Sequence, residues 1–321
     1  MNGNWNILVS ESRDFAPEAR QLLGSIGRVQ WEDLTREELP AHLREADVLW
    51  VRLRSRIDAG ILEAAPHLKI IASPTTGLNH IDMEAALARQ IRVLSLRGER
   101  QFLRSIRATA EHTIGLILSL LRHVPAAVEH VRGRGWNRDL FRGSELYGRN
   151  VGIVGYGRLG PIVAQYLSAF ECTVSVCDPF VRREDVAAPA RLVGLDELLA
   201  TSDVVTVHVD LNPNTQNLFG AGEFRRMRPG AFFINTSRGE LVDEAALLEA
   251  LESGQLGGAA LDVICREHKY EDSPLIEWAR SHSNLIITPH IGGCTSESMA
   301  RSEVFLAGRL REMVSVMETE N

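Results

Sequence analysis

A glycine-rich turn between an apolar strand pattern and an apolar helix pattern is the feature that most constrains the fold of this chain. Residues 151–167 read VGIVGYGRLGPIVAQYL and place GxGxxG at Gly155, Gly157 and Gly160. A second strand-like run ends at Asp178, 18 residues after Gly160. GxGxxG alone is a weak signal, but this strand, helix and strand order predicts a βαβ unit of a doubly wound parallel sheet.

Each position in this turn has a physical reason that indicates a dinucleotide. Gly155 permits the tight turn, Gly157 lets the backbone approach a pyrophosphate, and Gly160 lets the helix lie close to the strand. The unpaired N–H groups at the helix start favour phosphate. Asp178 can accept hydrogen bonds from ribose hydroxyls and would repel a 2′-phosphate, so NAD is the expected cofactor. The arginine pair at 182–183 leaves NADP as an alternative.

Alternating strand and helix patterns divide the 321 residues into two α/β domains. In the first, the patterns predict strands at 5–10, 28–31, 48–53, 68–72 and 92–95, and helices at 18–23, 59–65 and 83–89. In the second, they predict strands at 151–154, 172–177, 204–209, 231–235, 258–263 and 285–288. A long helix at 108–124 connects the two, and the Gly- and Arg-rich stretch that follows it, up to residue 149, is expected to be a loop or an arm. A last helix spans about 296–317.

Composition narrows the function classes. The 35 Lys and Arg residues against 42 Asp and Glu give a net charge of −7, which offers no positive field for a nucleic-acid partner. Lys69 and Lys269 are the only lysines, and neither follows the glycine-rich turn, so a Walker-type phosphate loop is excluded. No apolar run approaches the roughly 20 residues that cross a bilayer, so no membrane partner is expected.

The cysteines and the first residues indicate a reducing compartment. The cysteines, at 172, 177, 265 and 294, include no CxxC pair and have no histidine at ligand spacing, so neither a metal site nor a disulfide framework is expected. The N-terminal sequence MNGNWN lacks the basic segment and apolar stretch of a signal peptide. A cytoplasmic location is therefore the expectation.

Three polar motifs follow the last predicted strands of the second domain. They read INTSRG at 234–239, LDVICRE at 261–267 and TPHIGG at 288–293. Parallel strands bring their carboxyl ends to one edge of the sheet, where ligands bind in open α/β folds. There His290 can exchange a proton near neutral pH, Glu267 can orient its ring, and Arg238 can grip a carboxylate with its planar fork.

With ATAEHT at 108–113, LEAAPHLK at 62–69 and GLNHID at 77–82, this ordered set resembles the D-isomer-specific 2-hydroxyacid dehydrogenases. That family includes phosphoglycerate, glycerate, formate and D-lactate dehydrogenases, and the resemblance covers nearly the whole chain. It implies an NAD-dependent oxidoreductase that interconverts a D-2-hydroxy acid and its 2-oxo acid by hydride transfer. The catalytic residues are then expected to be Arg238, Glu267 and His290.

The resemblance also implies the domain organisation and the ligand sets. Two Rossmann-like or flavodoxin-like domains are expected, with an NAD domain at 106–294, a doubly wound parallel sheet, inserted into a substrate domain made of 1–105 and 295–321. The cofactor residues expected are Gly155, Tyr156, Gly157, Arg158, Leu159, Gly160, Asp178, Thr109, Thr236, Ser237, Asp262 and Gly292. The substrate contacts expected are Thr76, Gly77 and Arg52. The partners implied are a small anionic 2-hydroxy or 2-oxo acid and a second copy bound through the NAD domain, with no metal.

Several departures keep the substrate and the activity open. Several phosphoglycerate enzymes of the family carry Arg at the position of Ser73, and Asp210 and Asn212 replace a usual Pro and Thr. Four arginines between 97 and 107 are spaced to share one helix face, which suggests a cationic rim for an anionic substrate. The alternatives are an NADPH-preferring glyoxylate or hydroxypyruvate reductase and an NAD-sensing binding protein like the family's corepressors.

Overall fold

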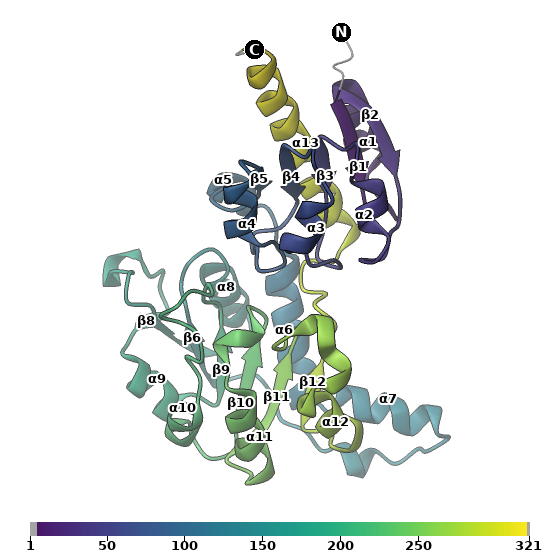
Figure 1. Ribbon diagram of the computed structural model, residues 1–321. Helices are drawn as coiled ribbons and strands as arrows, with labels where there is room; N and C mark the ends of the chain where they lie inside the picture. The colour runs from purple at the N-terminus through teal and green to yellow at the C-terminus, as the bar shows by residue number, and fades with distance from the viewer. Residues whose placement is uncertain (1–4, 320–321) are drawn as a thin grey trace. The chain divides into compact units, whose positions relative to one another are not determined.

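The computed structural model describes residues 5–319 and divides them into two compact units (Figure 1). One unit joins the residues up to Ser105 to those from Thr295 onward, and the other is Ile106–Cys294. Residues 1–4 and 320–321, which fall within the expected domain bounds, lie outside the described residues. Each unit contains one sheet, and every strand pair in both sheets is parallel.

The first unit is a five-stranded sheet with the order β2-β1-β3-β4-β5. Its strands are β1 (Trp5–Val9), β2 (Gly27–Trp31), β3 (Val48–Trp50), β4 (Ile70–Ser73) and β5 (Arg92–Ser95). Its helices are α1 (Pro17–Ile26), α2 (Leu39–His42), α3 (Ala59–Glu63), α4 (Met83–Ala88), α5 (Arg100–Leu103) and α13 (Ser296–Thr319). The carboxylates of Asp58 and Asp82 cap the starts of α3 and α4. This strand order is that of flavodoxin-like sheets.

The second unit is a seven-stranded sheet with the order β12-β11-β10-β9-β6-β7-β8. Its strands are β6 (Asn150–Val154), β7 (Thr173–Cys177), β8 (Arg191–Leu192), β9 (Val204–Val207), β10 (Ala231–Asn235), β11 (Leu256–Leu261) and β12 (Leu285–Ile287). Its α-helices are α6 (Ala108–Leu121), α7 (Val124–Arg132), α8 (Gly160–Ala169), α9 (Leu195–Thr201), α10 (Ala221–Arg226), α11 (Glu244–Glu252) and α12 (Pro274–Ser281). The chain runs outward in both directions from β6 and β9, as in a Rossmann sheet, which confirms the expected fold class.

Apolar layers on both faces explain why the central strands of the second unit are continuous hydrophobic runs. One cluster packs β9 and β10 against helices that include α10 and α11, with Phe219, Phe224 and Phe233 in contact. The other packs β6 and β7 against α6 and α8. Parallel strands covered on both sides carry few polar residues, so the polar motifs are confined to the strand ends.

Three local expectations were wrong. The segment after α6 is not a loop throughout, because His123 at φ 54° breaks the helix and α7 then begins at Val124, with Pro125 in its first turn. The two-residue strand β8 pairs with β7 although its sequence is too short to give a strand pattern. The arginines between 97 and 107 do not share one helix face, since Gly98 is at φ 89° and α5 is only four residues long.

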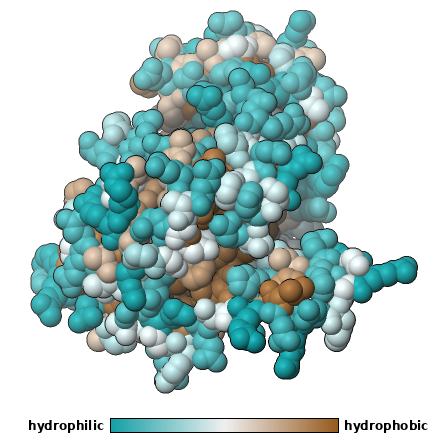
Figure 2. Space-filling view, turned by 90° about the horizontal axis from the view of Figure 1, so that it is seen from below, coloured by the Kyte–Doolittle hydropathy of each residue, from teal (hydrophilic) through white to brown (hydrophobic). Residues whose placement is uncertain are grey.

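Among residues 5–319, no single helix is both long and apolar enough to cross a membrane. One pair of helical segments, 100–121 and 124–132, meets the length and composition criteria together, with a bend of 65° between them. Figure 2 shows hydrophobic residues, in brown, exposed among hydrophilic ones on the face seen from below.

Candidate active site

The glycine-rich turn joins β6 to α8 and excludes side chains at two of its three glycines. A Cβ on Gly155, which has φ 96°, would lie 2.4 Å from the carbonyl oxygen of His208. A Cβ on Gly160 would lie 2.4 Å from the carbonyl oxygen of Gly155. Around Gly157 no described atom comes within 4 Å of a Cβ, so the turn presents bare backbone to open space. Leu159, just before α8, is half-buried among the apolar residues below the turn.

Asp178 ties the end of β7 to this turn. Its Oδ2 accepts a hydrogen bond of 2.8 Å from the amide of Tyr156, and its Oδ1 accepts one of 2.9 Å from the amide of Phe180. The neighbouring Arg182 directs its guanidinium at Asp185, with Nε 3.0 Å from Oδ2. This ion pair gives Arg182 a carboxylate partner other than Asp178.

A buried imidazole lies beneath the same turn. Nε2 of His208 is 3.1 Å from the hydroxyl of Thr206, while Nδ1 is buried and has no hydrogen-bond partner among residues 5–319. Burial, with the nearby Arg158 charge, lowers the pKa of His208 to about 3, so the ring is neutral at neutral pH. Burial also lowers the pKa of Arg158, which the carboxylate of Asp210 opposes. Bare backbone, an unpaired ring nitrogen and a half-buried guanidinium together fit a bound phosphate-containing cofactor.

Arg238 lies just beyond β10 in a surrounding of carboxylates. Its guanidinium donates a hydrogen bond to the carbonyl of Ser237. Burial lowers the pKa of Arg238, and the carboxylates of Glu267, Glu240 and Asp210 act in the opposite direction. The guanidinium of an arginine can also donate hydrogen bonds to a carboxylate ligand as a further anionic partner.

Asn235, the last residue of β10, shapes the turn that carries Arg238. Its Nδ2 donates a 2.8 Å hydrogen bond to the carbonyl of Arg238, and its Oδ1 accepts one of 2.9 Å from the amide of Ser237. The hydroxyl of Ser237 donates to the carbonyl of Val207, at the end of the neighbouring strand β9. The turn is therefore fixed to two strands of the sheet.

A close backbone contact brings the Arg238 turn next to the loop after β11. A Cβ on Gly239 would lie 2.0 Å from the carbonyl carbon of Ile264 and 2.3 Å from the amide nitrogen of Cys265. The carboxylate of Glu244, at the start of α11, accepts a 2.6 Å hydrogen bond from the same Cys265 amide. These contacts fix the loop that leads to Glu267.

The imidazole of His290 meets the carboxylate of Glu267. Nδ1 of His290 is 2.9 Å from Oε2 of Glu267, and the two side chains are 23% and 40% exposed. His290 has φ 54°, an uncommon conformation for a residue with a side chain, and its amide donates to the carbonyls of Asp262 and Thr288. Strain of this kind persists where surrounding contacts fix the residue, as they do here.

Asp262 organises the loop on the other side of His290. Its carboxylate accepts hydrogen bonds from the amides of Ile291 and Gly292, at 2.9 and 2.7 Å, and from the hydroxyl of Thr288. Nε2 of His112, on α6, is 3.2 Å from the same carboxylate. Burial alone would raise the pKa of Asp262, but these hydrogen bonds outweigh it and lower the pKa below the ordinary 3.8.

Threonines connect α6 to the turn after β10. The hydroxyl of Thr113 lies 2.9 Å from that of Thr236 and donates to the carbonyl of Thr109. A Cβ on Gly292 would lie 3.3 Å from the methyl group of Thr109 and 2.8 Å from the carboxylate of Asp262. Thr113 thus links Thr109 to Thr236, and Gly292 lies close to both Thr109 and Asp262.

The residues of the first unit that are expected to contact substrate differ in their exposure and in the partners they already have. Thr76 is exposed and Gly77 is half-buried in the turn after β4, where the hydroxyl of Thr75 donates to the carbonyl of Gly77. Arg52, just after β3, is 16% exposed and forms an ion pair with Glu303 of α13. Thr75 therefore shapes this turn, while Arg52 already has a charged partner.

Sequence reasoning missed several residues that position this site. His112 and Thr113 lie within the ATAEHT segment, one helical turn beyond Thr109, so their place on one face of α6 was a usable signal. Asn235 lies within the INTSRG segment and bonds residues two and three positions later, so its place there was also a usable signal. Glu244 gave no such signal, because its partner, the amide of Cys265, comes from another loop. Among the described residues, no group of three or more His, Cys, Asp or Glu side chains is arranged to hold a metal ion.

Comparison with known proteins identifies the family. Residues 114–292 match the model of the D-isomer specific 2-hydroxyacid dehydrogenase, NAD binding domain. The chain is 38% identical over 304 residues to D-3-phosphoglycerate dehydrogenase of Mycobacterium tuberculosis and 37% identical over 289 residues to that of Archaeoglobus fulgidus. These matches cover 92% and 90% of this chain and 54% and 53% of the relatives, so the chain spans about half the length of the curated relatives it matches.

Solved structures share both the fold and the extent of the chain. A protein of Thermus thermophilus, TT0316, is 33% identical with a TM-score of 0.79 and 94% of each chain covered. The D-lactate dehydrogenase of Aquifex aeolicus, solved with NAD and lactic acid, is 27% identical with a TM-score of 0.82 and covers 97% of this chain and 95% of its own. With an NAD-binding domain at residues 114–292, this chain belongs to the D-isomer specific 2-hydroxyacid dehydrogenase family.

Proposed function

We propose that the chain is an NAD-dependent oxidoreductase that interconverts a small D-2-hydroxy acid and its 2-oxo acid. The observation that carries the proposal is the 2.9 Å contact between His290 and Glu267, with the charge of Arg238 close enough to act on Glu267. An imidazole to exchange a proton, a carboxylate to orient it and a guanidinium to bind a carboxylate are what this reaction needs.

In the proposed chemistry, the bound NAD supplies the acceptor for the hydride. Glu267 engages Nδ1 of His290, so Nε2 is the atom that takes the hydroxyl proton during oxidation and returns it during reduction. Arg238 binds the substrate carboxylate and polarises the 2-oxo group. Asp262 acts on the chemistry by holding the loop that fixes the backbone of His290.

Residues of the second unit hold the cofactor in this proposal. The pyrophosphate would lie at the bare backbone of the glycine-rich turn, whose helix start offers unpaired N–H groups. The set is Gly155, Tyr156, Gly157, Arg158, Leu159, Gly160, Asp178, Thr109, Thr236, Ser237, Asp262 and Gly292. The carboxylate of Asp178 at the glycine-rich turn, together with the pairing of Arg182 to Asp185, supports NAD over NADP.

The substrate is proposed to be a small anionic 2-hydroxy or 2-oxo acid, with backbone at Thr76 and Gly77 and the side chain of Arg52 as further contacts. The turn at Thr76 is exposed and offers amides, which bind a carboxylate without a side-chain charge. A cytoplasmic location is also proposed. The four cysteines, all among the described residues, are present as free thiols.

A homodimer formed through the NAD domain is also proposed. Large apolar side chains are exposed on α7 and in the segment after it, where an unpartnered apolar surface indicates an interface. They are Val124, Val128, Val131, Trp136, Leu140 and Tyr147. Light scattering of a Val128→Glu/Trp136→Ser variant is expected to give a monomer, whereas Phe180→Ser, which removes an equally exposed ring elsewhere, is expected to leave the dimer intact.

One assay tests the function. NADH and NADPH oxidation is measured with glyoxylate, hydroxypyruvate, pyruvate and bulkier 2-oxo acids, and turnover with NADH is expected for at least one of them. A preference for NADPH with glyoxylate or hydroxypyruvate would favour the reductase alternative. Tight NADH binding without turnover of any acid would favour an NAD-sensing protein and refute the proposed enzyme.

A further inference from the structure

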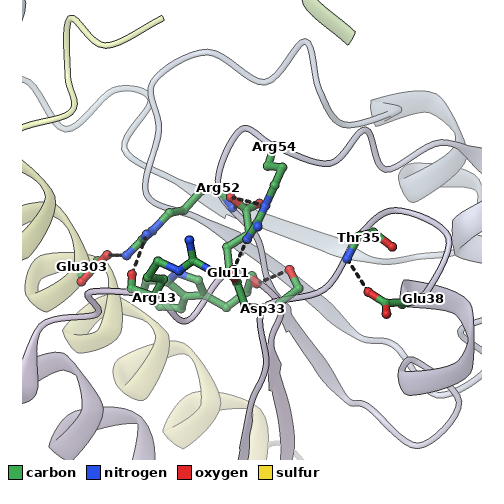
Figure 3. Close-up of polar contacts among 10 residues, drawn as sticks. Glu11, Arg13, Asp33, Thr35, Glu38, Arg52, Arg54 and Glu303 are labelled. Carbon is green, nitrogen blue, oxygen red and sulfur yellow. Dashed lines mark hydrogen bonds and ion pairs between the residues drawn. The ribbon is translucent and has the colours of Figure 1, made fainter. Parts of the chain in front are cut away.

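Six charged side chains gather around the carboxyl end of the sheet in the first unit (Figure 3). They are Glu11 and Arg13 after β1, Asp33 after β2, Arg52 and Arg54 after β3, and Glu303 on α13. Within the sheet, β1 has β2 as its neighbour on one side and β3 as its neighbour on the other. The strand order therefore reverses direction at β1. This group therefore marks the topological switch point, the place where open α/β sheets bind ligands.

Arg52 is committed to partners within this group. Its Nη2 forms an ion pair with Glu303, whose side chain is 1% exposed, and its Nη1 donates a 3.2 Å hydrogen bond to the carbonyl of Arg13. Glu303 also accepts a 2.8 Å hydrogen bond from the amide of Ala16. Nε of Arg52 is buried without a hydrogen-bond partner among residues 5–319. The charge of Arg52 is therefore matched by a buried carboxylate, and its remaining nitrogen is enclosed.

The other two arginines, Arg54 and Arg13, also form ion pairs with carboxylates of this group. Arg54 forms ion pairs with Asp33 and, at 3.9 Å, with Glu11. Arg13 pairs with Asp33 at 2.9 Å. The hydrogen bond from Arg54 lowers the pKa of Asp33, and burial raises the pKa of Glu11. Where Glu11 is ionised, three guanidinium groups face three carboxylates, so the group as a whole is neutral.

The last residue of the neighbouring strand β4 is uncharged. Ser73, the last residue of β4, is buried with its hydroxyl 3.0 Å from that of Thr75 and 3.1 Å from Nε2 of His80. Arg56 and the arginines of the 97–104 segment are exposed. Charges in such positions are hydrated and screened by salt, so they contribute little to holding a phosphate.

We propose that Glu303 determines which substrate charge the enzyme prefers, because it neutralises Arg52. The enzyme then prefers a 2-oxo acid with one negative charge over the same acid carrying a phosphate. This inference rests on the proposed oxidoreductase function. In the proposed function, the substrate carboxylate is bound by one positively charged side chain, that of Arg238. A phosphate dianion at the first unit would have to compete with the buried Glu303 for Arg52, and the closely placed like charges would repel each other.

The test compares hydroxypyruvate with 3-phosphohydroxypyruvate, which differ only in the phosphate. For the unaltered full-length chain, kcat/KM is expected to be higher for hydroxypyruvate. Glu303→Gln keeps the shape and one acceptor oxygen, but it replaces the other oxygen with an NH₂ donor and frees the charge of Arg52. It is expected to shift the ratio of the two kcat/KM values toward the phosphorylated acid by at least about tenfold, mainly through KM. Glu312→Gln makes the same change on α13, where Glu312 pairs with the exposed Arg309, and is expected to leave the ratio unchanged.

Two results would overturn the proposal: a preference of the unaltered chain for 3-phosphohydroxypyruvate, or an equal loss on both acids in Glu303→Gln. If Glu303→Gln does not fold, Asp33→Asn releases Arg54 and Arg13 at a partly exposed position, and a shift in the same direction is expected. Calorimetric titration of the NADH-loaded chain with glycerate and 3-phosphoglycerate measures the preference without turnover. Absent turnover with selective glycerate binding would refute the proposed enzyme while supporting the charge preference, and tighter 3-phosphoglycerate binding would refute the preference.

Discussion

Nδ1 of His290 lies 2.9 Å from Oε2 of Glu267, although the two residues come from different loops and are 23 positions apart in the chain. The contact fixes which ring nitrogen faces the carboxylate and which is left to exchange a proton. Both loops are anchored independently of it, one through Glu244 and Gly239 and the other through Asp262. The pair is therefore positioned by the fold and does not depend on its own hydrogen bond for its geometry.

Removal of the charge of Glu267 tests its role in orienting His290. Glu267→Gln keeps a hydrogen-bond acceptor but allows the amide to present either its oxygen or its NH₂ group to the ring. We expect kcat to fall by about tenfold to a hundredfold, with the Kd for NADH unchanged. Glu271→Gln, an exposed position in the same short helical segment, serves as the matched control. An unchanged kcat and pH profile in Glu267→Gln would show that the contact is only structural.

Removal of the imidazole tests proton exchange itself. His290→Ala is expected to lower kcat by about a hundredfold to ten-thousandfold, the range typical of a lost general acid or base. Because the proposed pyrophosphate site lies at the glycine-rich turn and not at His290, fluorescence titration is expected to give a Kd for NADH close to that of the unaltered chain. A near-normal kcat would refute the proposed role.

The sequence predicted the strand ends better than it predicted what meets there. GxGxxG and the three polar motifs each follow an apolar run, and parallel strands must bring those ends to one edge, so the edge could be inferred without coordinates. His112 reaches Asp262 from a helix about 150 positions away, and no spacing rule specifies that contact. The neutralisation of Arg52 by Glu303 spans 251 positions and was equally hidden, because it depends on where the last helix packs.

At residues 97–107 the sequence pattern predicted a shared helix face that the structure does not have. Spacings of three and four between arginines are typical of a helix face, yet Gly98 adopts a positive φ and the helix lasts only from Arg100 to Leu103. Local backbone preference thus overrode the charge pattern. The helix α7 was missed for a related reason, since its start depends on the positive φ of His123, which composition does not indicate.

Substitutions at two glycines of the same turn are expected to have different effects, one on the stability of the fold and the other on cofactor binding. A Cβ on Gly160 would overlap the carbonyl of Gly155, so Gly160→Ala is expected to lower the Tm by several degrees. A Cβ on Gly157 meets no described atom within 4 Å, so Gly157→Ala is expected to keep the Tm of the apoprotein. Its methyl group would instead occupy the space proposed for the pyrophosphate and weaken NADH binding by about tenfold or more. Unaltered NADH binding in folded Gly157→Ala would contradict the proposed cofactor position.

The lowered pKa of Asp262 predicts how stability depends on pH. Hydrogen bonds to its ionised carboxylate hold the folded pKa below the ordinary 3.8, so their contribution is present above about pH 3.8 and is lost as the pH falls through the folded pKa. Asp262→Asn should therefore unfold at lower urea concentration at pH 7, with a loss of about 1–3 kcal/mol for a buried hydrogen-bonded charge. The difference should shrink as the pH is lowered from 4 toward 2. Asp272→Asn, at an exposed site, is expected to change neither value, and a pH-independent loss in Asp262→Asn would contradict this account.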